Sequence, residues 1–496
     1  MNRSITRLGI VLVVLFVALF VKLNWIQVID KDALDTNPLN TAQVRRDFNR
    51  PRGSIVTADG FLLAQSIPNP DTNSQFDQIR VYPEGDLFAH TTGFFSFRYG
   101  STGIEKQYND ELVGSTFGQQ VKGFSDLFVS SRNSGDVTVS LRRDVQQVAR
   151  DQLGDRQGSV VALDPRTGAI LGFWSWPSYD PNLVSSVETA VAETAWKSYN
   201  TDPARPMRPH MYQDRYFPGS TFKTVTAGIG LQTGKVTNVT PVYPFTDGYL
   251  PAMTDKTIRN FGGESCGGPL PEILRVSCNS AFAEMGTETI GAADMTSGAA
   301  SWGFNSAAPI DLPDPVRSVF PTNLANDPPR LAMSSIGQND VQATPLQMAL
   351  VAAGVANGGV IMRPHVVTEV RNDQGEIVST VSPSRWLTPM SPYNAATLAD
   401  DMLGIVRSGT AAGMAIPGCA VGGKTGTAQL GTEPPRSHTW IIGFAGPPGG
   451  QPTVAVAVVV LDQSGGSEAT GGRVAAPIAR AVLQTALAAQ GGCGSR

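Results

Sequence analysis

The chain opens with an uncharged apolar run at residues 8–21, followed by a softer apolar stretch. A helix that crosses a bilayer needs ~20 apolar residues, so the strict run alone would also suit a signal peptide. No small-x-small cleavage site follows, and Lys22 and Trp25 stand where interfacial side chains anchor a helix. We therefore expect an uncleaved transmembrane anchor at residues 7–29, behind a tail at residues 1–6.

Two arginines on the short N-terminal side decide the orientation that we expect, Arg3 and Arg7. The positive-inside tendency keeps such residues in the cytoplasm. The sequence therefore predicts a single-pass protein of the plasma membrane with a cytoplasmic N-terminus and an extracytoplasmic remainder.

Short strand and turn patterns fill residues 30–157. In residues 52–64, two short strands flank Asp59-Gly60, a dipeptide typical of tight hairpins. Residues 100–114 predict a short helix between glycines. Catalytic residue types do not cluster in this region, and we interpret it as a β-rich supporting domain.

Residues 158–490 show core-strand patterns near both ends and helical patterns between them. The predicted elements are a hairpin at 158–175, strands at 438–446 and 453–462, and a helix at 475–488. A further helix begins where Thr344 can cap and Pro345 occupies the first turn. This arrangement predicts an α+β domain whose sheet is closed by the two ends of the domain, with a tail at 491–496.

The length, the net charge and the cysteine spacing limit the classes of function that this chain can have. At 496 residues, two or three domains are expected, and a net charge of −4 without a basic run argues against a nucleic-acid partner. The cysteines lack metal-ligand spacing, so we expect no zinc site. Cys266 and Cys278 are the first candidates for a disulfide, although four cysteines allow three pairings.

Residues 418–425 fit a nucleotide-binding loop, glycine, four residues, then Gly-Lys-Thr. Such a loop should lead into a helix, but Gly426, Gly431 and two prolines follow. Residues 457–462 are an apolar run that ends in an acid, as in the second motif of nucleotide-binding proteins. Such runs are also common in the strands of other sheet proteins. We therefore favour a different role for this segment.

Ser220 and Lys223 form the chain's one Ser-x-x-Lys. If Ser220 opens a helix, the lysine lies one turn further on the same face, where its amine can meet the hydroxyl. A serine needs a neighbouring base, and a lysine serves when burial and a nearby cation lower its pKa. Taken alone, this motif is more often a helix cap.

Two further motifs follow in order. Ser277 and Asn279 are two apart, so in an extended or loop segment they point the same way, one able to relay a proton and the other to hold a carbonyl. Lys424-Thr425-Gly426 would suit an edge strand that a substrate backbone can approach closely. Each motif is weak alone; the ordered set of three is specific.

This ordered set resembles the penicillin-binding proteins and serine β-lactamases, whose signatures are Ser-x-x-Lys, Ser-x-Asn and Lys-Thr-Gly. With an anchor and a pedestal, the chain looks like a class B, monofunctional penicillin-binding protein. Residues 52–64 and 100–114 resemble two N-terminal boxes of that class, although Thr57 and Ala58 replace the acid and base of the first box, which puts its salt bridges in doubt. The short pedestal and the lack of an additional C-terminal domain are similar to the actinobacterial penicillin-binding protein A group, linked to septal wall synthesis.

The resemblance implies a pedestal or dimerisation-like domain at 30–157 and a transpeptidase domain at 158–490, an antiparallel sheet with helices on both sides. It implies D,D-transpeptidase activity through a serine acyl-enzyme, inhibited by β-lactams, and a role in cell-wall synthesis, division and cell shape. No metal or organic cofactor is required. The implied partners are peptidoglycan stem peptides, a lipid-linked glycan polymerase and division proteins.

The resemblance also implies a role for each motif residue. Ser220 would be the nucleophile, Lys223 its base, Ser277 the proton relay, and Lys424 an electrostatic support, while Asn279 binds the peptide amide region. Thr425, Gly426 and Thr427 would bind substrate, with the terminal carboxylate on the two threonines. The backbone amides of Ser220 and Thr427 would form the oxyanion hole.

Three alternatives remain. A β-lactamase would need a deacylating base, and no Glu-x-x-Leu-Asn segment follows Ser277. A D,D-carboxypeptidase shares the first half-reaction and uses water as acceptor. A β-lactam sensor or scaffold would be acylated without turnover, or would only recruit partners.

Other prominent residues have structural interpretations. We expect Trp174 and Trp176 to pack in the hairpin rather than bind substrate, and Glu105 to be an ion-pair partner rather than a catalyst. His438 and Trp440 could line the cleft, with packing favoured over substrate contact.

Overall fold

The computed structural model describes residues 2–28, 48–114, 134–464 and 470–493. It contains two compact units, one formed by Met1–Pro51 with Ile67–Ile79 and the other by Arg52–Ser66 with Arg80–Arg496. The smaller unit contains helix α1 (Asn2–Val28), in which Thr6–Trp25 is long and apolar enough to cross a membrane, with a mean hydropathy of 2.4. By length and composition, this helix is the candidate for a single membrane span among the described residues.

A five-stranded antiparallel sheet forms the centre of the larger unit, in the order β17-β18-β19-β7-β8. The strands are β17 (Ala420–Gln429), β18 (Arg436–Gly446), β19 (Val454–Ser464), β7 (Gly158–Leu163) and β8 (Ile170–Trp176). The predicted hairpin is therefore confirmed. Because β19 pairs with β7, the first and last strands of the domain meet in the sheet, as the sequence predicts.

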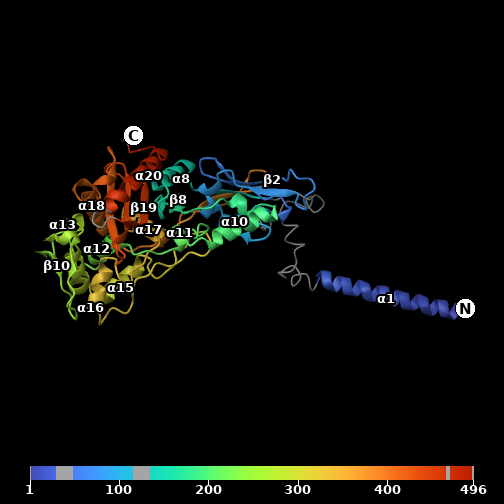
Figure 1. Ribbon diagram of the computed structural model, residues 1–496, viewed down its shortest axis with the longest axis horizontal. Coiled ribbons are helices and arrows are strands. Elements are labelled where there is room, and N and C mark those ends of the chain that lie inside the picture. The colour runs from blue at the N-terminus through green and yellow to red at the C-terminus, as the bar shows by residue number, and fades with distance from the viewer. Residues whose placement is uncertain (1, 29–47, 115–133, 465–469, 494–496) are drawn as a thin grey trace. The chain divides into compact units, whose positions relative to one another are not determined.

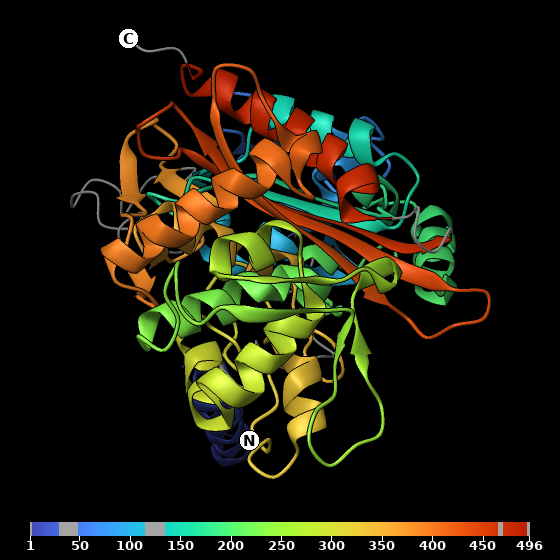
Figure 2. The same cartoon turned by 90° about the vertical axis from the view of Figure 1, so that its left-hand side faces the viewer.

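Helices cover both faces of this sheet, which confirms the predicted α+β architecture (Figures 1 and 2). On one face lie α8 (Arg143–Leu153) and α20 (Ala476–Ala489), and on the other α17 (Pro345–Ala356), whose residues are all buried. Thr344 accepts a hydrogen bond from the Gln347 amide at 3.0 Å, the predicted N-cap. An apolar helix buried all round is typical of the core of a large domain.

A second sheet contains six strands, in the order β15-β14-β6-β1-β2-β3. The strands are β1 (Ile55–Val56), β2 (Leu62–Pro68), β3 (Gln78–Val81), β6 (Asp136–Val139), β14 (Val367–Arg371) and β15 (Ile377–Thr380). The predicted hairpin of β1 and β2 is confirmed. Two of the six strands come from residues far beyond 157, so the division at 157/158 stays a prediction.

The remaining elements are short strands and helices. Four two-stranded ribbons pair β4 (Phe95–Ser96) with β5 (Gly100–Ser101), β9 (Tyr243–Thr246) with β12 (Cys266–Gly268), β10 (Gly248–Tyr249) with β11 (Ile258–Arg259), and β13 (Ile361–Met362) with β16 (Arg385–Leu387). The other helices are α4 (Ala89–Thr92), α5 (Gly103–Gln107), α6 (Asn109–Val113), α9 (Pro181–Val184), α10 (Thr189–Thr201), α11 (His210–Gln213), α12 (Lys223–Gln232), α13 (Leu270–Arg275), α14 (Asn279–Glu284), α15 (Ala292–Ser301), α16 (Pro328–Ser335), α18 (Pro392–Ser408) and α19 (Gly471–Val474). The prediction of one helix at 100–114 is wrong in detail: β5 precedes two short helices, α5 and α6.

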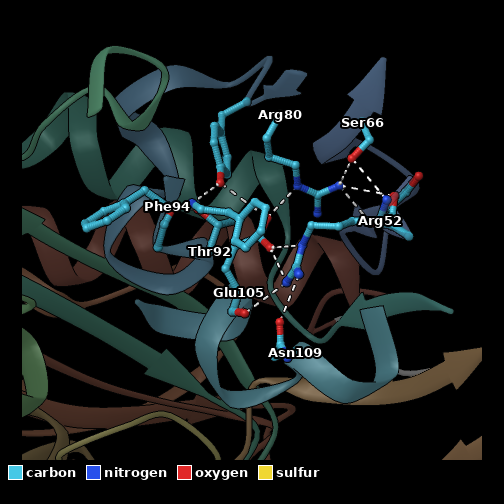
Figure 3. Close-up of polar contacts among 12 residues, drawn as sticks. Arg52, Ser66, Arg80, Thr92, Phe94, Glu105 and Asn109 are labelled. Atoms are coloured by element: carbon cyan, nitrogen blue, oxygen red, sulfur yellow. Dashed lines mark hydrogen bonds and ion pairs between the residues drawn. The ribbon is translucent and has the colours of Figure 1, made fainter. Parts of the chain in front are cut away.

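Glu105 is the centre of a buried ion-pair cluster in the supporting domain, as predicted (Figure 3). Arg52 and Arg80 bind its two carboxylate oxygens at 2.9 and 2.6 Å, and all three side chains are at most 1% exposed. Burial alone would raise the pKa of Glu105, but the charges of the two arginines lower it below its ordinary value. Arg52 also donates to Asn109, so the cluster joins the two N-terminal boxes.

Disulfides join Cys266 to Cys278, the predicted pair, and Cys419 to Cys493. The first attaches β12 to Cys278, the residue between Ser277 and Asn279. The second attaches the residue before β17 to the C-terminal segment.

Candidate active site

The Ser-x-x-Lys motif lies at the junction of two helical segments. Ser220 belongs to the 3₁₀ turn η3 (Gly219–Phe222), and Lys223 is the first residue of α12. This turn lies against β17: a side-chain carbon on Gly426 would come within 2.8 Å of the Pro218 carbonyl oxygen and 3.1 Å of the Thr221 amide. The first and third motifs therefore meet in space, and glycine at 426 permits the contact.

The edge position predicted for Lys424 is confirmed, because β17 is the first strand of the five-stranded sheet. Residues 420–429 are a continuous strand, with Thr425 paired opposite Ile441 and Thr427 opposite Thr439. A phosphate-binding loop needs a turn and a following helix here, so the nucleotide interpretation is excluded.

Ser277 stands between the two lysines. Its hydroxyl accepts a hydrogen bond from Lys424 Nζ at 2.8 Å and one from Lys223 Nζ at 3.3 Å. Lys223 Nζ also donates to the Ser277 carbonyl at 2.7 Å and to Asn279 Oδ1 at 2.6 Å. The second motif thus bridges the first and the third.

The segment around Ser277 is a turn rather than an extended strand. Ser277 has a φ of 62°, in the left-handed region, and Asn279 is the first residue of α14. The two side chains still meet, because both contact the same amine. A left-handed non-glycine residue stores local strain, a feature that concentrates at functional sites.

The two lysines are completely buried, and burial is the first cause of their altered pKa values. Burial lowers the pKa of Lys424 to about 7. Burial and the neighbouring charge of Lys424 lower the pKa of Lys223 well below its ordinary value. Burial and the charge of Lys424 therefore both favour the neutral form of the amine at 223.

Ser220 is half-buried, and within the described ranges its side chain makes no hydrogen bond. The amine of Lys223 binds the second motif instead, so the direct contact between these two side chains stays a prediction. A neutral amine has two N–H groups, which can donate to Ser277 O and Asn279 Oδ1, the two shorter of its three contacts. The lone pair of the Lys223 nitrogen then remains free to accept the proton of the Ser220 hydroxyl.

Thr410 is a site residue that the motifs do not reveal. Thr425, itself 7% exposed, donates its hydroxyl to Thr410 Oγ1 at 2.7 Å. The Thr410 amide contacts the Arg275 carbonyl at 3.4 Å, and Arg275 donates to the Ser408 carbonyl at 2.9 Å. These contacts connect the helix before Ser277 to the third motif.

Two aromatic residues of β18 contact the segment that leads to Ser220. Trp440 is fully buried and donates its indole N–H to the Phe217 carbonyl at 3.0 Å, which positions the segment before Ser220. His438 packs edge-on against Tyr216 with ring centroids 5.6 Å apart, and burial lowers its pKa to about 4. Trp174 is buried in the sheet, as predicted.

Comparison with known proteins agrees with this geometry. The penicillin binding protein transpeptidase domain matches residues 158–484, and the penicillin binding protein A dimerisation domain matches residues 52–137. Peptidoglycan D,D-transpeptidase PbpA of Mycolicibacterium smegmatis is 39% identical over 98% of this chain and 99% of its own length. PbpA of Mycobacterium tuberculosis is 36% identical, with the same shares covered.

Solved structures give the same result. Penicillin-binding protein A from M. tuberculosis, as its ceftriaxone acyl-enzyme complex, superposes with a TM-score of 0.81 at 35% identity, covering 89% of this chain and 99% of that one. Its imipenem acyl-enzyme complex also gives a TM-score of 0.81, at 36% identity, covering 89% and 100%. The chain belongs to the penicillin-binding protein transpeptidases, as a class B member similar to mycobacterial penicillin-binding protein A.

Proposed function

We propose that this protein is a peptidoglycan D,D-transpeptidase that crosslinks stem peptides through a serine acyl-enzyme and is inhibited by β-lactams. The observation that carries the proposal is the hydroxyl of Ser277, which two buried lysines share. This arrangement supports both proton transfers that acyl transfer from D-Ala-D-Ala requires.

In the first half-reaction, Ser220 Oγ attacks the carbonyl carbon of the penultimate D-Ala while the neutral amine of Lys223 takes its proton. The tetrahedral oxyanion is bound by the backbone amides of Ser220 and Thr427, a contribution of roughly 3 kcal/mol per donor in such enzymes. The C–N bond then breaks. Ser277 gives its proton to the departing D-Ala nitrogen and receives one from the Lys223 ammonium.

In the second half-reaction, the amine of a second stem peptide attacks the ester carbonyl. The amine loses a proton through the same relay, the new amide bond forms, and Ser220 leaves with its hydroxyl restored. Lys424 stabilises the relay by its hydrogen bond to Ser277. No metal or cofactor enters this scheme.

Substrate binding follows from the edge position of β17. An extended peptide can add to an exposed strand edge, with backbone hydrogen bonds giving affinity. In this proposal the hydroxyls of Thr425 and Thr427 receive the terminal carboxylate, Gly426 leaves room for the peptide backbone, and Asn279 binds the peptide amide. Thr425 is already held by Thr410, which fixes its side chain before substrate arrives.

The location and organisation are also proposed. Residues 1–6 would form a cytoplasmic tail and 7–29 the anchor, with 30–157 as pedestal, 158–490 as extracytoplasmic transpeptidase domain and 491–496 as tail. A lipid-linked glycan polymerase and division proteins would be its membrane partners. The support is the apolar helix α1 and the two arginines before its core.

Labelled penicillin followed by mass spectrometry tests the function. We expect stable covalent mass on the peptide that contains Ser220, and none in Ser220→Ala. With a D-Ala-D-Ala donor and an amine acceptor, product should depend on the acceptor. Hydrolysis that ignores the acceptor would instead indicate a carboxypeptidase, rapid penicillin hydrolysis a β-lactamase, and labelling without peptide turnover a sensor.

A further inference from the structure

A cavity of about 350 Å³ lies beside the segment that leads to Ser220, and its wall is unusually basic. Arg205, Arg208 and Arg215 line it, together with one acid, Asp214, and with Tyr216. We call this the arginine pocket. Three arginines and a single acid therefore line this cavity.

Both carboxylate oxygens of Asp214 already have hydrogen-bond partners. Its Oδ2 contacts Arg205 Nη2 and His210 Nδ1, each at 2.7 Å, and its Oδ1 contacts Arg208 Nε at 2.5 Å. Burial would raise the pKa of Asp214, but the bonds from His210 and Arg208 lower it to about 2. This carboxylate therefore stays ionised and neutralises at most part of the pocket.

Arg215 is the arginine of this pocket that has no ion pair with Asp214. It is exposed, and its one side-chain hydrogen bond to a described residue is a 3.4 Å contact with the Arg317 carbonyl. No described carboxylate pairs with it. A planar guanidinium fork matches a carboxylate in two parallel hydrogen bonds, so an arginine that lines a polar cavity suits this anion.

The pocket adjoins the proposed substrate path. Tyr216, in its wall, packs edge-on against His438, and His438 is the register partner of Ala428 on β17. Ala428 directly follows Thr427. The pocket wall is therefore one ring contact away from the strand next to β17, and Tyr216 stands four residues before Ser220 in the chain.

We propose that the arginine pocket is a subsite for a free carboxylate inside the peptide substrate, distinct from the terminal D-Ala carboxylate. The inference rests on the proposed transpeptidase function. The carboxylate could belong to the donor or to the acceptor strand, and the chemistry of recognition is the same for both.

The test uses the full-length protein in detergent with a D-Ala-D-Ala donor peptide and an amine acceptor peptide. Each peptide carries one interior carboxyl, prepared as the free acid or as the carboxamide, and kcat/KM is measured for the four combinations. We expect the free acid to react about ten-fold faster on one strand, as for a charge-assisted hydrogen bond. The strand that shows the preference identifies the source.

Arg215→Gln should reduce the acid-to-amide ratio to about one, through KM rather than kcat. Arg317→Gln is the matched control, because it removes an exposed arginine nearby while keeping the carbonyl that Arg215 contacts, and it should retain the ratio. Thermal unfolding of both variants separates loss of recognition from loss of folding.

Equal rates for acid and amide in the wild type would overturn the inference, as would a preference that survives Arg215→Gln. Failure of the proposed function looks different. In that case labelled penicillin does not modify Ser220 of the wild type, and none of the four peptide combinations gives product.

Discussion

Lys223 and Lys424 donate hydrogen bonds to one hydroxyl, that of Ser277, at 3.3 and 2.8 Å. Two ammonium groups that share one acceptor repel each other in a buried site, and burial disfavours both charges. One member of the pair therefore gives up its proton first. The proposed mechanism uses Lys223 as the base, and burial together with the charge of Lys424 lowers the pKa of its amine.

The first prediction concerns pH. Lys424→Met removes a charge that lowers the pKa of Lys223, so that pKa rises and the neutral base becomes scarcer in acid. The acid limb of the acylation rate should move to higher pH, with the largest loss below pH ~7, where Lys424 is charged. Stopped-flow measurement with a fluorescent penicillin gives this profile.

Lys197→Met, on the exposed surface of α10, serves as the control for that profile. It should leave the acid limb in place. An unchanged limb in Lys424→Met would show that the two amines are not electrostatically coupled.

Gly426→Ala should separate two motifs without unfolding the domain. The added carbon would lie 2.8 Å from the Pro218 carbonyl oxygen and 2.9 Å from Thr221 Cγ2, so the turn that carries Ser220 must move. A misplacement of about 1 Å costs on the order of 10²-fold in rate. We expect a loss of that order in acylation, measured with labelled penicillin.

Gly404→Ala is the matched control, because a carbon added at this position in α18 meets nothing within 4 Å. It should stabilise the helix by roughly 0.5–1 kcal/mol and leave acylation unchanged. Normal acylation in Gly426→Ala would mean that the turn and β17 are not in this close contact.

Thr410→Val should weaken substrate binding. It removes the oxygen that accepts the Thr425 hydroxyl, a bond worth about 1 kcal/mol, so KM for a D-Ala-D-Ala peptide should rise roughly five- to ten-fold with kcat less affected. Steady-state kinetics measures the split, and Thr410→Ser should rescue it. An equal effect of Thr485→Val, on α20, would point to general destabilisation instead.

Glu105→Gln should destabilise the supporting domain. Without Glu105, two buried guanidinium groups lose their counter-charge, at a cost of about 3–5 kcal/mol. Glu193→Gln breaks a pair whose partners are 49% and 52% exposed and should cost at most ~1 kcal/mol. Urea unfolding compares the two, and similar costs would contradict the buried-cluster interpretation.

The same cluster has a pH dependence of known sign. The pKa of Glu105 is lowered in the folded state, so its contribution to stability is present above the unfolded pKa and is lost as pH falls through the folded value. Glu105→Gln should therefore flatten the acid side of the stability profile.

The sequence predicts the local parts of this molecule well. These parts depend on residues that are close together in the chain, because turn residues and hydrophobic periodicity determine local structure. They are the motif order, the hairpin at 158–175, the cap at Thr344 and the edge strand at Lys424. The ion-pair role of Glu105 also follows from its place in residues 100–114, which resemble an N-terminal box of the family.

Long-range pairings are what the sequence does not reveal. Strands β14 and β15 join the supporting sheet from residues 367–380, and no local pattern identifies their partners. Thr410 meets Thr425 because a loop returns there, and Arg275 holds that loop. The preference of the Lys223 amine for Ser277 and Asn279 depends on a left-handed turn that residue types alone do not specify.

The bond between Cys266 and Cys278 gives the catalytic loop a dependence on its surroundings, because Cys278 stands between Ser277 and Asn279. Disulfides persist in oxidising compartments and are rare where thiols are kept reduced. A copy held in the cytosol would lack this covalent tie at the relay. In the proposed extracytoplasmic location this bond would persist, and it would hold the relay loop covalently to β12.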